Sequence, residues 1–308
     1  MSIKENDHPP CTHLSDGVLV RLDWKYHDLA HASDDAILEI TEAYPCTVDL
    51  YNLLLNDKRT RALWDMTAYV SIGKMGHNDH GQVHAQVVAA NALRIAEVLT
   101  RRGIALDVER SGAGDRRDAM LVILAAAMLH DIGNQIHREG HEGYGVTLAA
   151  PVLERLLQRI YLDVTKRQIM TSFILSAIAT HDLNPPPVSM EAAIVAVADG
   201  TDLTEGRGRA VFESGRVDSH SLSALAVEEV VIEEGVTTPI NITALVDDPS
   251  GMFQVEKILA PKVMGSCLTE YVTLRVCSLS EDSPFGQCVI WLDGQFDEDS
   301  PRQKRRQR

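Results

Sequence analysis

Histidine and aspartate residues recur along this chain at positions that could bind metal ions. In sequence order they are His84, His130, Asp131, His141, His181 and Asp199. Each lies in or beside an apolar segment with helical periodicity, which would give it a fixed place in a folded core. Neutral imidazoles combined with carboxylates form a donor set that suits Mn, Fe, Co, Ni, Mg or Zn. The order of these residues and their placement on helices predict a divalent metal site.

The adjacent pair His130 and Asp131 carries the strongest part of this prediction. The pair follows the apolar stretch from Met120 to Leu129. Ionisable side chains at the end of a buried helix pay a desolvation penalty that a metal ion offsets. Because a carboxylate can bridge two ions through its two oxygens, Asp131 is the natural bridge. Asp199 keeps a second interpretation, since Asp199-Gly200 is also typical of a helix end.

The elements expected to position these residues are mainly helices. Apolar periodicity predicts one or two helices over 47–72 and further helices near 81–100, 116–130, 143–160, 166–180 and 189–203. Asn78-Asp79 is expected to cap the helix that carries His84. After residue 218 the apolar period changes to two, which predicts strands at 227–234, 239–247, 270–279 and 287–292. A helix over 251–264 is expected between the second and third of these strands.

These patterns predict a mainly α protein in which a helical metal domain precedes a small α+β domain. The expected organisation is a polar, loosely packed N-terminal extension over 1–45, the helical domain over 46–217, the α+β domain of ββαββ order over 218–295, and a basic disordered tail over 296–308. No pattern assigns a role to the α+β domain.

The order of the candidate ligands resembles the H…HD…D pattern of the HD superfamily of metal-dependent phosphohydrolases. The string His130-Asp131-Ile132-Gly133 is similar to the HDIG variant of that family, and the stretch from Asn78 to His84 resembles its first motif. The resemblance covers about residues 47–205. It implies an all-helical HD-type domain with two metal ions. One ion would be held by His84, His130, Asp131 and Asp199, and the other by Asp131, His141 and His181.

The resemblance implies a hydrolase that cleaves a phosphomonoester or phosphodiester, most simply a nucleotide-like small molecule, with metal-activated water. Asp131, His130 and Asp199 would be the catalytic residues. Arg138 and Arg207 are candidates for binding the phosphate, although a solvated surface position is the commoner role for an arginine. His80 precedes His84 by one helical turn and is a candidate extra ligand or an ordinary hydrogen-bonded residue. A di-iron HD-type oxygenase and a regulatory metal-binding module without turnover are the alternatives.

Composition and short motifs argue against several other classes of protein. The net charge of −15 disfavours nucleic-acid binding, because an acidic surface repels the phosphate backbone. Five cysteines without a CxxC pair are expected to be reduced thiols of a cytoplasmic protein. No apolar signal core or membrane-length run occurs, which predicts a soluble protein without a membrane partner. No GxSxG string occurs, which argues against a serine hydrolase elbow. The sequence leaves open whether the protein forms a homo-oligomer.

Overall fold

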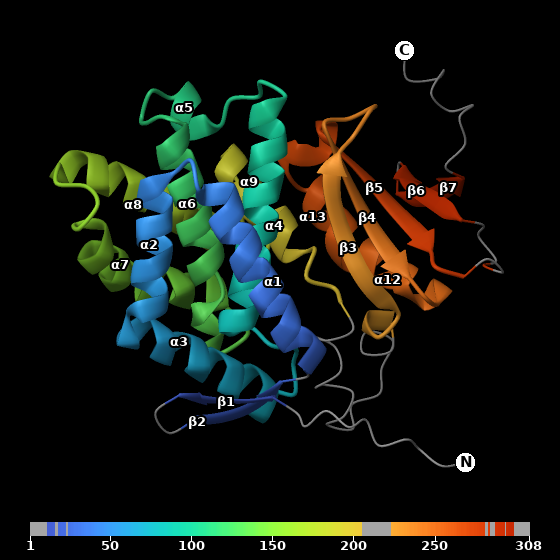
Figure 1. Cartoon of the computed structure of the whole chain (residues 1–308), viewed down its shortest axis with the longest axis horizontal. Helices are drawn as coiled ribbons and strands as arrows, with labels where there is room; N and C mark the ends of the chain where they lie inside the picture. The colour runs from blue at the N-terminus through green and yellow to red at the C-terminus, as the bar shows by residue number, and fades with distance from the viewer. Residues whose placement is uncertain are drawn as a thin grey trace.

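A computed structural model gives the architecture of residues 11–15, 18–22, 24–204, 223–280, 283, 287–292 and 294–298. A bundle of helices lies on one side and a twisted sheet with short helices on the other (Figure 1). The predicted mainly α fold followed by a small α+β part is confirmed. The helical part consists of α1 (Trp24–Thr41), α2 (Pro45–Asn56), α3 (Lys58–Ala68), the π-helix η1 (Tyr69–Lys74), α4 (Gln82–Arg101), α5 (Asp107–Arg110), α6 (Arg116–Leu129), the 3-10 helix η2 (Ile132–Gln135), α7 (His141–Leu157), α8 (Val164–Thr180) and α9 (Met190–Asp199).

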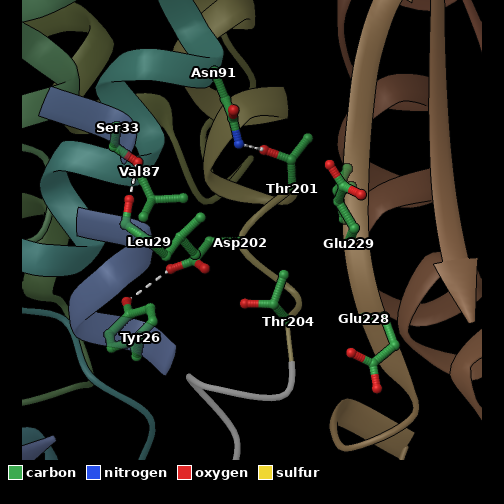
Figure 2. A pocket seen from close by; sticks show the side chains of 11 residues that line it. Tyr26, Leu29, Ser33, Val87, Asn91, Thr201, Asp202, Thr204, Glu228 and Glu229 are labelled. Atoms are coloured by element: carbon green, nitrogen blue, oxygen red, sulfur yellow. Dashed lines mark hydrogen bonds between the residues drawn. The ribbon is translucent and has the colours of Figure 1, made fainter. Parts of the chain in front are cut away.

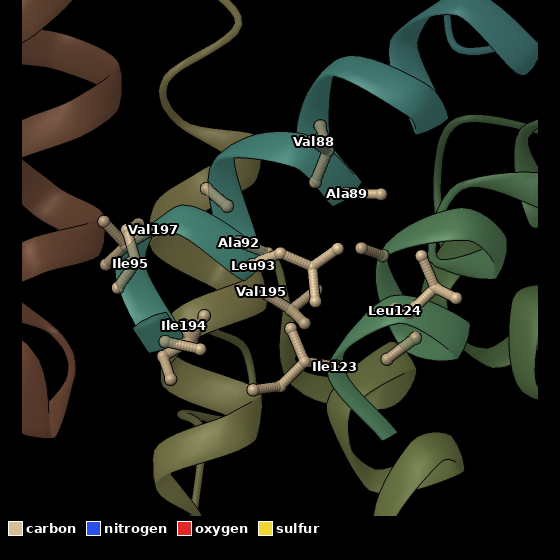
Figure 3. Packing of buried hydrophobic residues seen from close by; sticks show 14 of the residues in the cluster. Val88, Ala89, Ala92, Leu93, Ile95, Ile123, Leu124, Ile194, Val195 and Val197 are labelled. Carbon is tan, nitrogen blue, oxygen red and sulfur yellow. The ribbon is translucent and has the colours of Figure 1, made fainter. Parts of the chain in front are cut away.

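The centre of the bundle is α6. Every residue of this helix from Ala119 to Leu129 is buried, because α2, α4, α8 and α9 all pack against it. Figure 3 shows Leu93 of α4, Ile123 of α6 and Val195 of α9 meeting in this core. A helix that is apolar on most faces is stable only when it is enclosed in this way. The enclosure fixes the end of α6, where His130 and Asp131 follow.

The cap of α4 differs from the predicted one. Gly81 is the N-cap residue, and Asp79 lies two positions earlier. The Asp79 carboxylate accepts a hydrogen bond from the Gly81 backbone N–H at 2.9 Å, so it orders the loop before the helix and not the first turn itself. The helix still begins where the sequence places it, with His84 in its first turn.

The sheet has the strand order β3-β4-β5-β6-β7. Its strands are β3 (Val227–Glu234), β4 (Ile240–Val246), β5 (Val272–Ser278), β6 (Cys288–Leu292) and β7 (Gln295–Glu298). β4 and β5 are parallel and the other neighbours are antiparallel. The crossover between β4 and β5 contains η3 (Pro249–Gly251), α12 (Met252–Gln254), the π-helix η4 (Val255–Leu259), α13 (Ala260–Met264) and η5 (Cys267–Glu270). The single predicted helix over 251–264 is therefore a chain of short pieces, with Pro261 in the first turn of α13.

The sheet and its helices pack against the helical bundle without a separate core. Val227, Ile242 and Leu259 belong to the same hydrophobic cluster as the buried residues of α4, α6 and α9. α13 lies against α9, and β3 lies against α4 (Figure 1). The boundary between a helical domain and an α+β domain at 217/218 lies outside the described residues and stays a prediction.

The two ends of the chain differ from the sequence expectation. Within residues 1–45, which were expected to form a loose extension, β1 (Cys11–Ser15) pairs with β2 (Val18–Leu22), and α1 packs along α4. Ile37 and Tyr26 of α1 are buried, so this segment is part of the fold. At the other end, β7 occupies the start of the expected tail over 296–308, and residues 299–308 lie outside the described part.

The expectation of reduced cysteines is wrong for one pair. Cys277 and Cys288 form a disulfide between β5 and β6. The two residues are direct partners across these antiparallel strands, a register that brings their β-carbons within reach of each other. Cys46 and Cys267 are free thiols. Within the described ranges, the helices are too short or too polar to cross a membrane.

Candidate metal centre

The structure brings the six predicted ligands together in two adjoining clusters. The first contains His84, His130, Asp131 and Asp199, and the second contains Asp131, His141 and His181. Within each cluster, one candidate ligand atom per residue lies within 4.8 Å of the others. The residues come from the first turn of α4, the end of α6, the start of α7, the end of α8 and the end of α9. Five helix ends thus converge on one point of the bundle.

Asp131 belongs to both clusters and divides its carboxylate between them. Its Oδ2 lies 3.2 Å from His84 Nε2 and 3.3 Å from His130 Nε2. Its Oδ1 lies 3.3 Å from His141 Nε2 and 3.5 Å from His181 Nε2. The side-chain amide of Asn134 donates to Oδ1 at 2.8 Å and fixes the rotation of the carboxylate. Each oxygen therefore faces one pair of imidazoles, as a bridging ligand requires.

Three of the histidines are oriented by backbone carbonyls. The Nδ1–H groups of His130, His141 and His181 donate to the carbonyl three residues earlier, at 2.8, 2.9 and 2.7 Å respectively. The last carbonyls of a helix lack an N–H partner within the helix, so they are available at the ends of α6 and α8. Each bond fixes the tautomer with Nδ1 protonated and leaves the Nε2 lone pair pointing into the clusters.

His84 is oriented by a carboxylate. Its Nδ1 lies 2.7 Å from Asp202 Oδ2, and the same oxygen accepts a hydrogen bond from the Tyr26 hydroxyl at 2.9 Å. Figure 2 shows Asp202 and Tyr26 at the wall of a cavity of about 200 Å³ between α1, α4 and β3. The Nε2 of His84 faces the first cluster and not this cavity. A carboxylate behind a ligating histidine raises the basicity of the ring.

The chemistry of this donor set fits divalent metal ions. His84 Nε2 lies 3.2 Å from His130 Nε2, and His141 Nε2 lies 3.0 Å from His181 Nε2. With their Nδ1 atoms protonated, each pair would place two lone pairs against each other, an arrangement that is stable only with a cation or a proton between them. The buried carboxylate of Asp131 and the partly buried one of Asp199 add the negative charge that a divalent ion needs.

The charged groups within the centre shift the pKa values of its residues in the direction opposite to burial. Burial alone would raise the pKa of Asp131, but the neighbouring charges of His130 and His80 hold that pKa well below its usual range. Burial would lower the pKa of His130, but Asp131 and Asp199 raise it to about 9. Burial lowers the pKa of His181, since Asp131 offsets only part of the desolvation. The carboxylates of the first cluster therefore favour a positive charge at His130, against the effect of burial.

The three lower-ranked candidates have different positions. His80 Nδ1 lies 2.5 Å from Asp131 Oδ2, so its ring stands beside the first cluster, with 11% of its side chain exposed. Arg138 Nη1 lies 3.2 Å from His141 Nε2, and its Nη2 lies 3.5 Å from Asp182 Oδ2, so Arg138 stands beside the second cluster. Arg207 lies outside the described residues.

Close backbone contact sets the distance between the His-Asp turn and α7. A β-carbon placed on Gly133 would overlap the His141 carbonyl oxygen and stand 2.5 Å from the Gly145 nitrogen. Position 133 therefore tolerates no side chain while His141 stays within reach of Asp131.

Sequence reasoning missed the residues that hold the ligands in place. These are Asn134, Asp202 and Lys262, which contact Asp131, His84 and Asp199 respectively. Asp202 follows Asp199 by three residues and lay within the helix expected over 189–203, although α9 ends at Asp199. Lys262 comes from α13, and its Nζ lies 2.5 Å from Asp199 Oδ2. The sequence around Lys262 contains no motif that connects it with the metal ligands.

Comparison with known proteins agrees with this geometry. The HD domain family matches residues 72–204. An uncharacterized protein of Methanocaldococcus jannaschii is 35% identical over 241 residues, which cover 78% of this chain and 93% of the relative. No solved structure matches the chain. The chain belongs to the HD domain family, as its motif order predicted. Family and clusters together fit a hydrolase that depends on divalent metal.

Proposed function

We propose that this protein is a phosphohydrolase that holds two divalent ions and cleaves a phosphomonoester or phosphodiester of a nucleotide-like small molecule. The observation that carries the proposal is the position of Asp131, whose two oxygens face two separate imidazole pairs. HD family membership supports the hydrolase class, and the uncharacterized relative adds no substrate.

The residues of the centre would hold the ions and set their distance. Four histidine Nε2 atoms, the carboxylate of Asp131 and Asp199 Oδ1 would supply the ligands, and the Nδ1 bonds keep the rings from turning. When bound, the ions supply an acidified water as nucleophile and positive charge for the phosphoryl oxygens. Four imidazoles favour a transition metal over Mg, because imidazole suits Fe, Ni or Zn and all-oxygen sites suit Mg.

Arg138 is the residue best placed to bind the phosphate. Its side chain is 37% exposed, and its guanidinium reaches from the second cluster to Asp182 at the protein surface. A planar guanidinium can donate two parallel hydrogen bonds to phosphoryl oxygens. Asp182 holds Arg138 by an ion pair of 3.5 Å, so substrate phosphate would compete with a carboxylate that is itself 35% exposed.

His80 is the residue best placed to move a proton. Its Nδ1 contacts Asp131 Oδ2, and its partial exposure connects the first cluster with solvent. An imidazole in contact with both a metal ligand and solvent can accept a proton from an attacking water or give one to a leaving oxygen. This role needs no ligation by His80, so the candidate extra ligand becomes a candidate acid or base.

The test is a panel of phosphate esters assayed with the metal-free protein reloaded with Mn, Fe, Co, Ni, Mg or Zn, one ion at a time. The panel contains aryl phosphomonoesters, aryl phosphodiesters and nucleotides. Hydrolysis with at least one ion, lost in His130→Ala and kept in His137→Ala, supports the proposal. His137 is the matched control, because it is exposed and its ring accepts a hydrogen bond from the Glu139 N–H away from the clusters.

Two outcomes would contradict the proposal. Binding of two ions without hydrolysis of any ester class would leave a metal-binding module without this activity. Oxygen consumption by the iron-loaded protein, together with a mixed-valent di-iron spectrum, would assign the oxygenase alternative instead.

A further inference from the structure

One lysine of the C-terminal part reaches the metal centre. Lys262 of α13 is 7% exposed, and its ammonium lies against the last residue of α9 and the end of α8. Its Nζ contacts Asp199 Oδ2 at 2.5 Å and donates to the His181 carbonyl oxygen at 3.0 Å. Asp182 Oδ1 lies 3.6 Å from the same nitrogen. Three acceptors thus surround a group that has three N–H bonds to donate.

The space beside Gly200 accommodates the side chain of Lys262. The Lys262 stem passes over Gly200, where an added β-carbon would stand 3.0 Å from Lys262 Cδ and 3.3 Å from Leu259 Cδ1. A side chain at position 200 would crowd the lysine stem, and Gly200 leaves it room. The lysine then covers the C-terminus of α9, where a cation is favoured by the helix dipole.

Lys262 determines which oxygen of Asp199 faces the histidines. Asp199 Oδ2 is taken by the ammonium, while Oδ1 lies 3.1 Å from His84 Nε2 and 3.6 Å from His130 Nε2. A carboxylate held at one oxygen offers a single oxygen to an ion. The second contact of Lys262, with the carbonyl of His181, fixes the backbone of a residue in the other cluster.

Packing alone does not account for a lysine at this position. A buried ammonium carries a desolvation cost, and an apolar side chain of similar volume often stabilises a protein equally or better. The stem of Lys262 already lies in the hydrophobic contact between α13 and α9. A methionine could keep that contact. The ammonium group of Lys262 therefore has a role other than packing.

We propose that Lys262 is a positioning residue of the metal centre, through which the C-terminal part of the chain sets the affinity for the ion in the first cluster. The inference rests on the proposed function in one respect, that the clusters hold divalent ions. It does not depend on which reaction those ions support. The sheet and its helices are then a component of the centre, because α13 delivers the residue that restrains Asp199.

The experiment measures ion affinity by competition with a chromogenic chelator, using full-length protein loaded with Mn or Zn. Lys262→Met is expected to lower the affinity by about 10- to 100-fold, the size typical when a group that orients a ligand is removed. Lys257→Met is the matched control. That lysine lies five positions earlier, has 51% of its side chain exposed, and pairs with Glu256 at the surface.

A double-mutant cycle separates positioning from general support of the fold. If Lys262 acts through Asp199, Lys262→Met changes the affinity of an Asp199→Asn protein by less than about threefold, because coupled residues are not additive. Equal losses in both backgrounds would overturn the proposal, and so would an affinity within about threefold of the parent protein. If Lys262→Met does not fold when metal-free, Lys262→Gln is carried through the same cycle under the same criteria.

The outcomes also separate this inference from the proposed function. A parent protein that binds two ions but hydrolyses no ester contradicts the phosphohydrolase, while the affinity cycle still decides the role of Lys262. A parent protein that binds no divalent ion contradicts both. Normal hydrolysis together with unchanged affinity in Lys262→Met contradicts the role of Lys262 alone.

Discussion

Replacing Asp131 by alanine tests the central geometric argument. Each oxygen of this carboxylate faces a different histidine pair, at 3.2 to 3.5 Å from the Nε2 atoms. One substitution therefore removes one ligand from each cluster. We expect Asp131→Ala to lose both ions, whereas the loss of any single histidine should affect mainly one.

The magnitude follows from the charge removed. Two unit charges about 4 Å apart interact by roughly 4 kcal/mol at an effective dielectric constant of about 20. A divalent ion would gain about twice that from Asp131, but the metal-free protein already pairs this carboxylate with His80 and His130. We take the net loss as about 3 kcal/mol per ion, which corresponds to a roughly 100-fold weaker affinity at each cluster.

The assay is elemental analysis after reloading and dialysis, combined with the chelator competition. Asp131→Ala should retain less than about 0.3 equivalents of metal, given the roughly 100-fold loss at each cluster. Asp131→Asn keeps the shape and the contact with Asn134, so it separates the loss of charge from the loss of volume. Far-UV circular dichroism of the metal-free variants checks that α6 and α7 are intact.

The metal content of Asp131→Ala can contradict the bridging role in two ways. If Asp131→Ala retains one full equivalent, the carboxylate does not bridge, and one cluster binds its ion without it. If both equivalents remain, Asp131 is not a ligand, and its contacts with the four histidines serve only the fold.

Three further predictions concern His181, Asp202 and the α3 cap residue Asp57. His181→Ala should lose about one equivalent and lower hydrolysis by roughly two to three orders of magnitude, with His137→Ala as control; unchanged content and turnover would remove the second cluster from the proposal. Asp202→Asn should weaken metal binding by about 10- to 100-fold, because His84 loses its anionic partner, and Tyr26→Phe should weaken it less; chelator competition measures both, and equal effects would contradict the role of the charge. Burial raises the pKa of Asp57, but the hydrogen bonds from Thr60 and Arg155 lower it by more than burial raises it. The pKa of Asp57 in the folded protein therefore lies below its value in the unfolded protein. The stabilisation by Asp57 is present above the unfolded pKa and is lost as the pH falls through the folded pKa, so urea unfolding from pH 5 to pH 2 should show a smaller loss in Asp57→Asn than in the parent.

The helical bundle and the ligands could be predicted because both depend on local patterns. The apolar run before His130 admits one structure, an enclosed helix, and the ligands sit at the ends of such helices. The helix α1 could also have been predicted from the sequence. Its buried residues Tyr26, Ala30, Ser33 and Ile37 follow helical spacing, but two of them are small, so the segment looked polar. Small side chains are what allow α1 to pack closely on α4.

The rest could not be predicted because it depends on contacts between distant segments. Lys262 lies 63 residues from Asp199, and only the packing of α13 on α9 brings them together. The pairing of Cys277 with Cys288 depends on the register of β5 and β6, which an odd cysteine count without a CxxC pair conceals.

The backbone contact at Gly133 has a consequence for how related sequences can be classified. Because a β-carbon there would collide with the His141 carbonyl, the glycine after His130-Asp131-Ile132 is what keeps the second histidine pair in range. A relative with His and Asp at the turn but a larger residue at this position would need another path for the start of α7. The identity of that single residue would therefore indicate, before any measurement, whether such a chain can bring a histidine at the start of α7 as close to the His-Asp turn as it lies here.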